Sequence, residues 1–241
     1  MFDYTAAMAA PARVLDPEDQ RVIPGAMAAE RTIAVHPALA TLFPQGLVRG
    51  SSVVCLGAVA ASTAFLLTAA ATQADAWVGV AGLPTFGAQA CHEMGTALER
   101  VVMVRNLVGA PDDDSTWAPV LGALVDGFDL VVFGAAHQVR PATARRVQAR
   151  LQTRGGVLVL VGDAGPFAAD VRVSTAATWQ GLGDGNGYLR QRTVEMTVDG
   201  RRVPRSRHDL LAMPGPTGDI ESVGNTTSIP AGTLTALRWT G

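Results

Sequence analysis

The chain contains no lysine, so all 19 of its basic residues are arginine. The lysine of a phosphate-binding loop reaches the β- and γ-phosphates of a nucleotide, and no register of this sequence supplies that ammonium group. Cysteine is also scarce, since only Cys55 and Cys91 occur, both inside predicted secondary structure. We therefore expect neither a disulfide framework nor a Cys₂His₂ zinc site, and no other metal site. A reducing, cytoplasmic location fits this usage.

Long apolar runs are missing as well. Glycine, threonine or a charged residue interrupts each run before it reaches about 18 residues, so no transmembrane helix is predicted. The first four residues, MFDY, include an acid and no basic residue, so no secretory signal is predicted. The chain is 48% hydrophobic and 17% charged, which is enough to form a large core. We expect a folded cytoplasmic protein without a membrane partner.

The segment 52–67 predicts a buried strand, a glycine turn and a helix rich in alanine and leucine. A phosphate-binding loop at such a junction has the pattern G-x-x-x-x-G-K-[ST]. Gly57 is in place, but Ser62, Thr63 and Ala64 stand where Gly, Lys and Thr are expected. We interpret Gly57, Ser62 and Thr63 as a vestigial nucleotide loop that holds no cofactor. An ordinary strand–turn–helix without nucleotide ancestry is an equally weighted alternative.

Apolar strands alternate with helices through the middle of the chain, which predicts a parallel sheet covered on both faces. The strands are expected at 51–57, 76–81, 101–105, 129–134 and 157–162, and the helices at 61–73, 86–98, 115–126 and 141–153. Later segments at 171–175, 189–198 and 205–213 predict antiparallel strands added at the C-terminal edge of the sheet. The expected domains are an N-terminal helical arm (1–45), the α/β core (46–213) and a flexible tail (214–241).

The other two parts of a nucleotide hydrolase are also missing from their expected places. The strand 129–134 ends in Phe133 and Gly134, where a magnesium-binding acid would stand. Asp129 lies at the start of that strand, at the wrong end of the sheet to meet phosphates. The strand that ends near residue 81 is followed by glycine and leucine, with no acid to activate a water molecule. These absences predict a protein that is not an enzyme.

Arginine is concentrated in the second half of the chain. Residues 1–139 carry 6 arginines and 13 acids, whereas residues 140–210 carry 12 arginines and 6 acids. One stripe is expected on the helix 141–153, at Arg146, Arg150 and Arg154, and a second cluster surrounds the late hairpin. The hairpin cluster comprises Arg201, Arg202, Arg205 and Arg207. Both clusters are candidate binding surfaces for an anionic partner, either DNA or an acidic protein face. A solvated surface that neutralises the acidic half is the alternative.

Several segments together resemble one family. They are LFPQGLVRGSSVVCLG at 42–57, VAGLP at 80–84, EMGTALER at 93–100, GGVLVLVG at 155–162 and WQGLG at 179–183, followed by the arginine-rich hairpin. Over residues 40–214 the chain is similar to actinobacterial ImuA′-type proteins, which are RecA-like paralogues with degenerate nucleotide motifs. The resemblance implies a RecA-like α/β fold.

The resemblance also implies a function. Such proteins are non-catalytic accessory subunits of a damage-inducible mutagenesis complex. They act in translesion synthesis with ImuB, an inactive Y-family polymerase homologue, and with an error-prone replicative-type polymerase. The C-terminal part holds ImuB in that family, which points here to the late arginine cluster and to Trp239. The protein would be cytoplasmic, and nucleoid-associated when recruited to DNA.

Two other functions remain open from the sequence. One is a related SOS protein resembling SulA, which would bind a cell-division protein. The other is an unconventional nucleotide-binding ATPase, which would need an arginine in place of the missing lysine. Arg49 is the only basic residue near the loop in sequence, and its bulkier fork does not substitute for lysine without a change in the loop.

Overall fold

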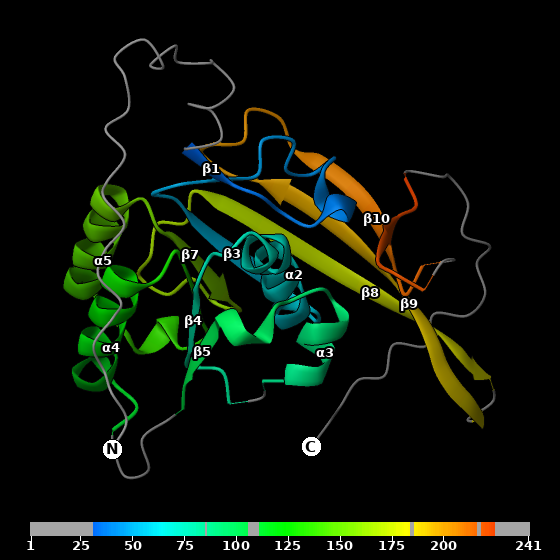
Figure 1. Ribbon diagram of the computed structural model, residues 1–241, viewed down its shortest axis with the longest axis horizontal. Helices are drawn as coiled ribbons and strands as arrows, with labels where there is room; N and C mark the ends of the chain where they lie inside the picture. The colour runs from blue at the N-terminus through cyan, green and yellow to red at the C-terminus, as the bar shows by residue number, and fades with distance from the viewer. Residues whose placement is uncertain (1–30, 85, 106–110, 184–185, 216–217, 225–241) are drawn as a thin grey trace, which may run out of the picture.

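The structure is a computed structural model that describes residues 31–84, 86–105, 111–183, 186–215 and 218–224. A nine-stranded sheet runs through it in the order β11-β10-β9-β8-β3-β7-β6-β4-β5 (Figure 1). Its strands are β3 (Ser52–Gly57), β4 (Val78–Ala81), β5 (Val101–Val104), β6 (Leu130–Phe133), β7 (Val157–Val161), β8 (Val171–Gly183), β9 (Asn186–Asp199), β10 (Arg207–Met213) and β11 (Glu221–Ser222). A separate two-stranded sheet pairs β1 (Thr32–Ile33) with β2 (Leu47–Val48).

The six strands from β8 to β5 run parallel to one another, and β9, β10 and β11 continue the sheet in antiparallel fashion. The helices are α2 (Ala60–Gln73), α3 (Ala88–Glu93), α4 (Asp114–Gly127) and α5 (Pro141–Arg154), with 3₁₀ turns η2 (Pro37–Leu39), η3 (Leu98–Arg100) and η4 (Ala136–Gln138). This architecture confirms the predicted fold class: a parallel-centred α/β sheet with helices on both faces and antiparallel strands at the C-terminal edge.

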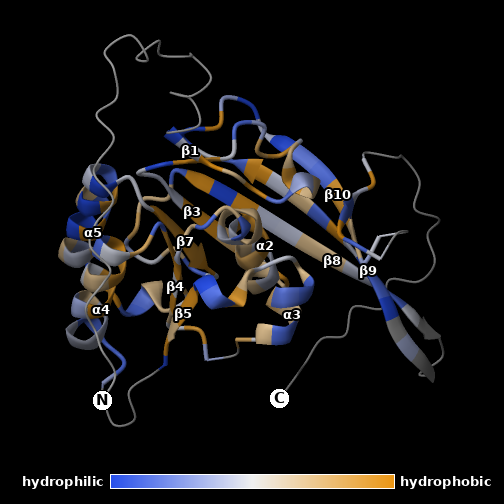
Figure 2. Cartoon of the chain, viewed as in Figure 1, coloured by the Kyte–Doolittle hydropathy of each residue, from blue (hydrophilic) through white to orange (hydrophobic). Residues whose placement is uncertain are grey.

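Two hydrophobic cores lie on the two faces of the sheet. On one face, α2 packs on β3, β6 and β7, and its fully buried Leu66 and Leu67 belong to the larger core. On the other face, α4 and α5 bury Trp117 and Leu151 against β6 and β7. Strands buried on both faces must be apolar throughout, as the valine-rich β7 is (Figure 2). The exposed side of α5 is hydrophilic in the same view.

The boundaries differ from the prediction in three places. The helix expected at 115–126 begins one residue earlier, and the pattern also suggested Ser115 as its N-cap, which is wrong: the Asp113 carboxylate accepts the backbone N–H of Ser115 at 2.8 Å and caps α4. The predicted helix 86–98 is wrong in its length: it ends at Glu93, and η3 follows after Gly95, whose φ of 88° is left-handed. The late strands β8 and β9 are also longer than predicted.

The segments flanking the core have described parts of their own. Within the predicted helical arm, residues 31–45 hold β1 and η2, and Leu39 and Leu42 are fully buried in the larger core. Within the predicted tail, Glu221–Ser222 forms β11 and pairs with β10. The part of the arm before residue 31 and the end of the tail lie outside the described residues. No helix among those that the structure describes is long and apolar enough to cross a membrane.

The Phe133 side chain provides a test of the packing on the α4–α5 face. It is fully buried and contacts the Trp117 ring edge-on, with centroids 5.4 Å apart. We expect Phe133→Ala to lower the free energy of unfolding by about 3–5 kcal/mol, because it leaves a cavity in a closely packed core. Urea denaturation measures this change. Val102→Ala, on the edge strand β5 where the side chain is 40% exposed, serves as control and should cost less than about 1 kcal/mol. Equal losses in the two variants would contradict the described packing.

Candidate functional site

The predicted nucleotide loop is a short, tightly packed connection. β3 ends at Gly57, and α2 begins at Ala60 with Val59 as its N-cap residue. Gly57 has a φ of 100°, and a Cβ there would collide with the Thr175 carbonyl oxygen of the adjacent strand β8. The glycine is therefore required by the close approach of two backbones. Only two residues separate strand from helix, which leaves no loop to wrap around a phosphate.

Two of the three side chains at the positions of the nucleotide motif are buried. Thr63, at the lysine position, is 1% exposed, and its hydroxyl donates to the Val59 carbonyl oxygen at 3.0 Å. Ala64, at the position of the magnesium-binding hydroxyl, is fully buried. Ser62 lies in the first turn of α2 and is partly exposed. The three predicted loop residues thus lie at one junction, but two of the motif positions are used for packing.

The neighbouring strand ends carry packing contacts in place of acids. A Cβ at Gly134, after β6, would collide with the Gly82 carbonyl oxygen and the Leu83 side chain. Asp129 lies at the opposite, amino edge of the sheet, where its carboxylate accepts the Trp77 backbone N–H at 3.0 Å. Burial raises the pKa of the nearby thiol of Cys55 far above its usual range, so it stays protonated. Asp163 follows β7 at the carboxyl edge, where it is exposed and its carboxylate accepts the Gly165 backbone N–H at 3.0 Å. Among the described residues, no acid directly follows β4 or β6.

The arginine stripe on α5 faces α4 and shares its charge with that helix. Arg150 and Arg154 form ion pairs with Asp126 at 3.2 and 3.5 Å, and Arg146 donates to the Thr143 hydroxyl at 3.1 Å. All three side chains remain at the surface, where such pairs contribute little to stability. The spacing was predicted correctly, with Val147 and Leu151 buried beneath it. Asp126 reduces the positive potential of the arginine stripe, so the stripe is a weaker anion site than the sequence indicates.

The second cluster is divided between structural and exposed roles. Arg207 donates to the Leu42 carbonyl oxygen at 3.0 Å and so ties β10 to the segment before β2. Arg205 is exposed and has no hydrogen bond or ion pair with the described residues. Trp239 lies outside the described residues. That these residues bind a partner or DNA stays a prediction.

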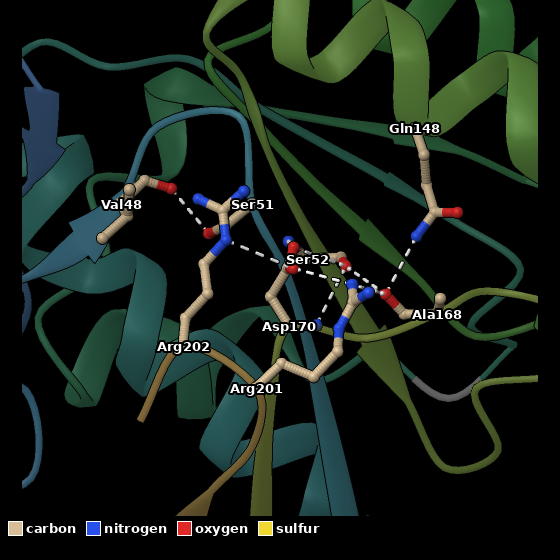
Figure 3. A network of polar contacts seen from close by, with 8 residues as sticks. All are labelled: Val48, Ser51, Ser52, Gln148, Ala168, Asp170, Arg201 and Arg202. Carbon is tan, nitrogen blue, oxygen red and sulfur yellow. Dashed lines mark hydrogen bonds and ion pairs between the residues drawn. The ribbon is translucent and has the colours of Figure 1, made fainter. Parts of the chain in front are cut away.

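Arg201 and Arg202 converge on one carboxylate, Asp170, which sequence reasoning missed (Figure 3). The Asp170 side chain is 12% exposed, and the two guanidinium groups lie 2.9 and 3.3 Å from its Oδ1. Its Oδ2 accepts the Ser52 backbone N–H at 3.0 Å. Asp170 thus fastens the start of β8 to the start of β3, and both arginines are held at the amino edge of the sheet. The contact could not be predicted from a single sequence, because Asp170 precedes a strand and is far in sequence from the two arginines.

The structure also places two aromatic side chains on the exposed end of the β8–β9 hairpin. Trp179 is 51% exposed and Tyr188 is 84% exposed. The Arg192 guanidinium lies over the Trp179 ring, 5.5 Å from its centroid, because the two residues are cross-strand partners. The sequence marked WQGLG only as part of a resemblance and gave no sign of this exposure.

Comparison with known proteins gives the family. The fold defines an α/β domain with a short, closely packed β3–α2 connection, and a family model described as the MT3502 N-terminal domain matches residues 41–166. The chain belongs to this family. The match ends before β8, so the antiparallel strands lie outside it.

Part of the chain is also similar to a protein of Mycobacterium tuberculosis. The uncharacterized protein Rv3395c is 32% identical over 108 residues, which is 44% of this chain. The chain spans about half the length of that curated relative.

The Asp170 network can be tested by its effect on stability. Asp170→Ala leaves the buried Ser52 N–H and two guanidinium groups without their acceptor, so we expect a loss of about 1–3 kcal/mol in the free energy of unfolding. Asp199→Ala is the matched control, because it removes an exposed pair with Arg172 and should cost less than about 1 kcal/mol. Urea denaturation compares the two. Equal small losses would show that Asp170 does not fasten β8 to β3.

Proposed function

We propose that this protein is a non-catalytic accessory subunit of a damage-inducible mutagenesis complex. In this role it binds an ImuB-like inactive Y-family polymerase homologue and works with an error-prone replicative-type polymerase in translesion synthesis. It acts in the cytoplasm, and at the nucleoid when it is recruited to DNA. The proposal rests on the resemblance of residues 40–214 to ImuA′-type proteins.

The observation that carries the non-catalytic part is the connection from β3 to α2. A phosphate site at a helix N-terminus needs backbone N–H groups that open toward a ligand and a lysine that reaches the phosphates. Here Gly57 is packed against β8, and Thr63 bonds its own helix. Because the chain has no lysine, no other part of it supplies this ammonium group. These features support a domain that retains the fold for binding partners and does not turn over nucleotide.

The partner surface proposed from the resemblance lies in the C-terminal part. Arg201, Arg202 and Arg207 are held by the Asp170 carboxylate and the Leu42 carbonyl oxygen. Substituting them would disturb the fold as well as a surface. Arg205 is exposed and Trp239 is separated from the core in sequence, so these two give the cleaner test.

Affinity purification from DNA-damaged cells tests this function. We expect ImuB-like and replicative-type polymerase subunits to co-purify with the full chain. A version that ends at Gly224 keeps β11 but removes Trp239, and we expect it to lose the ImuB-like partner, as should Trp239→Ala. Arg205→Glu should weaken the capture, because it reverses an exposed charge.

Arg145→Glu is the matched control for the charge reversal, since Arg145 is exposed on α5 and lies outside the late cluster. Recovery of a cell-division protein instead of polymerase subunits would contradict the proposal and favour the SulA-like function. Recovery of the polymerases by the version that ends at Gly224 would move the contact out of the tail.

A further inference from the structure

The β8–β9 hairpin continues beyond the body of the protein as a two-stranded ribbon. The pairing of β8 with β3 ends at Thr175, and the pairing of β10 with β9 ends at Arg192. Residues 180–183 and 186–191 therefore pair only with each other in the described structure, and Trp179 at the base of the ribbon pairs with Arg192. Figure 1 shows this ribbon extending past the rest of the sheet. Two-stranded ribbons are marginally stable in water, so an exposed one is an unusual structure to maintain without a binding role.

The exposed aromatic surface is concentrated on this ribbon. Among the large hydrophobic side chains of the described residues, Tyr188 and Trp179 are the most exposed, at 84% and 51%. Polar side chains at Thr178, Gln180 and Gln191 are exposed or half-buried on the same two strands. Aromatic and arginine side chains are enriched in protein interfaces as well as on surfaces on which bases stack, and the combination of open rings with an excess of positive charge favours bases here.

The ribbon is also positively charged. Its two strands carry Arg190 and Arg192 and no acid, and the connecting turn adds Asp184 by sequence. Arg190 is exposed and forms no ion pair with the described residues. The guanidinium of Arg192 lies over Trp179, which holds that ring in place while leaving about half of the side chain open to solvent.

A glycine bulge shapes the ribbon between the two aromatic residues. The register shifts between Gln180 and Leu182, and Gly181 has a φ of 107°. A Cβ at Gly181 would collide with the Tyr188 carbonyl oxygen. Bulges re-aim side chains and stop further pairing, so the tip does not serve as a template for sheet extension.

We propose that this ribbon binds single-stranded nucleic acid. Unpaired bases stack on Trp179 and Tyr188, and Arg190 and Arg192 contact the phosphates. The arginine stripe of α5 and the pair on Asp170 share their charge with internal acids, which leaves the ribbon as the described surface that combines free positive charge with open rings. This inference goes beyond the protein-binding role proposed above and does not depend on it.

Fluorescence anisotropy with the purified full chain and a fluorescein-labelled oligothymidine tests the proposal. We expect Trp179→Ala and Tyr188→Ala each to weaken binding by about 5- to 150-fold, the range for loss of one stacked base. Trp179→Phe should restore most of the affinity, because it keeps an aromatic face. Circular dichroism and the melting temperature of each variant should match the wild type, since both side chains are exposed.

Charge is tested with a matched pair of substitutions. Arg190→Ala should reduce the slope of log affinity against log salt by about 0.7, the value for one phosphate contact on a single strand. Arg145→Ala removes the same charge from α5 and should leave the slope unchanged. Absence of oligothymidine binding by the wild type, or equal affinity in the aromatic variants, would overturn the proposal. So would a loss of polymerase capture in the ribbon variants with oligothymidine binding intact, which would make the ribbon a protein contact.

Discussion

The hydrogen bond that the Ser52 backbone N–H donates to the Asp170 carboxylate joins the parallel and the antiparallel halves of the sheet. β3 is the last strand of the parallel half that is buried on both faces, and β8 is the strand that both halves share. A misplaced β8 would displace β9 and β10 with it, since each pairs with the one before. A buried carboxylate is costly unless its oxygens are bonded. Arg201 and Arg202 meet that requirement, and this use removes them from the freely available surface charge.

Close packing of the backbone also determines the structure of the carboxyl edge of the sheet. Ligands of open parallel sheets bind where the strands end, because loops and helix N-termini meet there. In this protein Gly57 abuts β8, and Gly134 abuts Gly82 and Leu83. Backbone contacts occupy the space at both of these strand ends. The protein therefore keeps a fold built around a ligand edge while its exposed features lie elsewhere, on the ribbon and the arginine-bearing loops.

The parallel strands could be predicted from the sequence because their burial determines their composition. Burial on both faces requires continuous apolar runs, and the runs at 129–134 and 157–162 match β6 and β7 within one residue at each end. The spacing of Arg146, Arg150 and Arg154 likewise predicted one helix face.

The partners of those residues were not predictable in the same way. Asp126 on α4 and Asp170 before β8 come into contact with arginines 24 to 32 residues away in sequence, through packing that no local period encodes. The exposure of Trp179 was missed for a related reason. An alternating strand normally indicates one buried face, and only the sheet register shows where the neighbouring strands end.

The proposed non-catalytic role depends on the absence of nucleotide chemistry at the β3–α2 junction. The most direct test is the release of phosphate from ATP by the purified full chain with magnesium, in the presence and absence of single-stranded DNA. A non-catalytic domain predicts the background rate under both conditions. Turnover above background that is lost when Ser62 or Thr63 is substituted, in variants that keep the wild-type melting temperature, would contradict a non-catalytic junction.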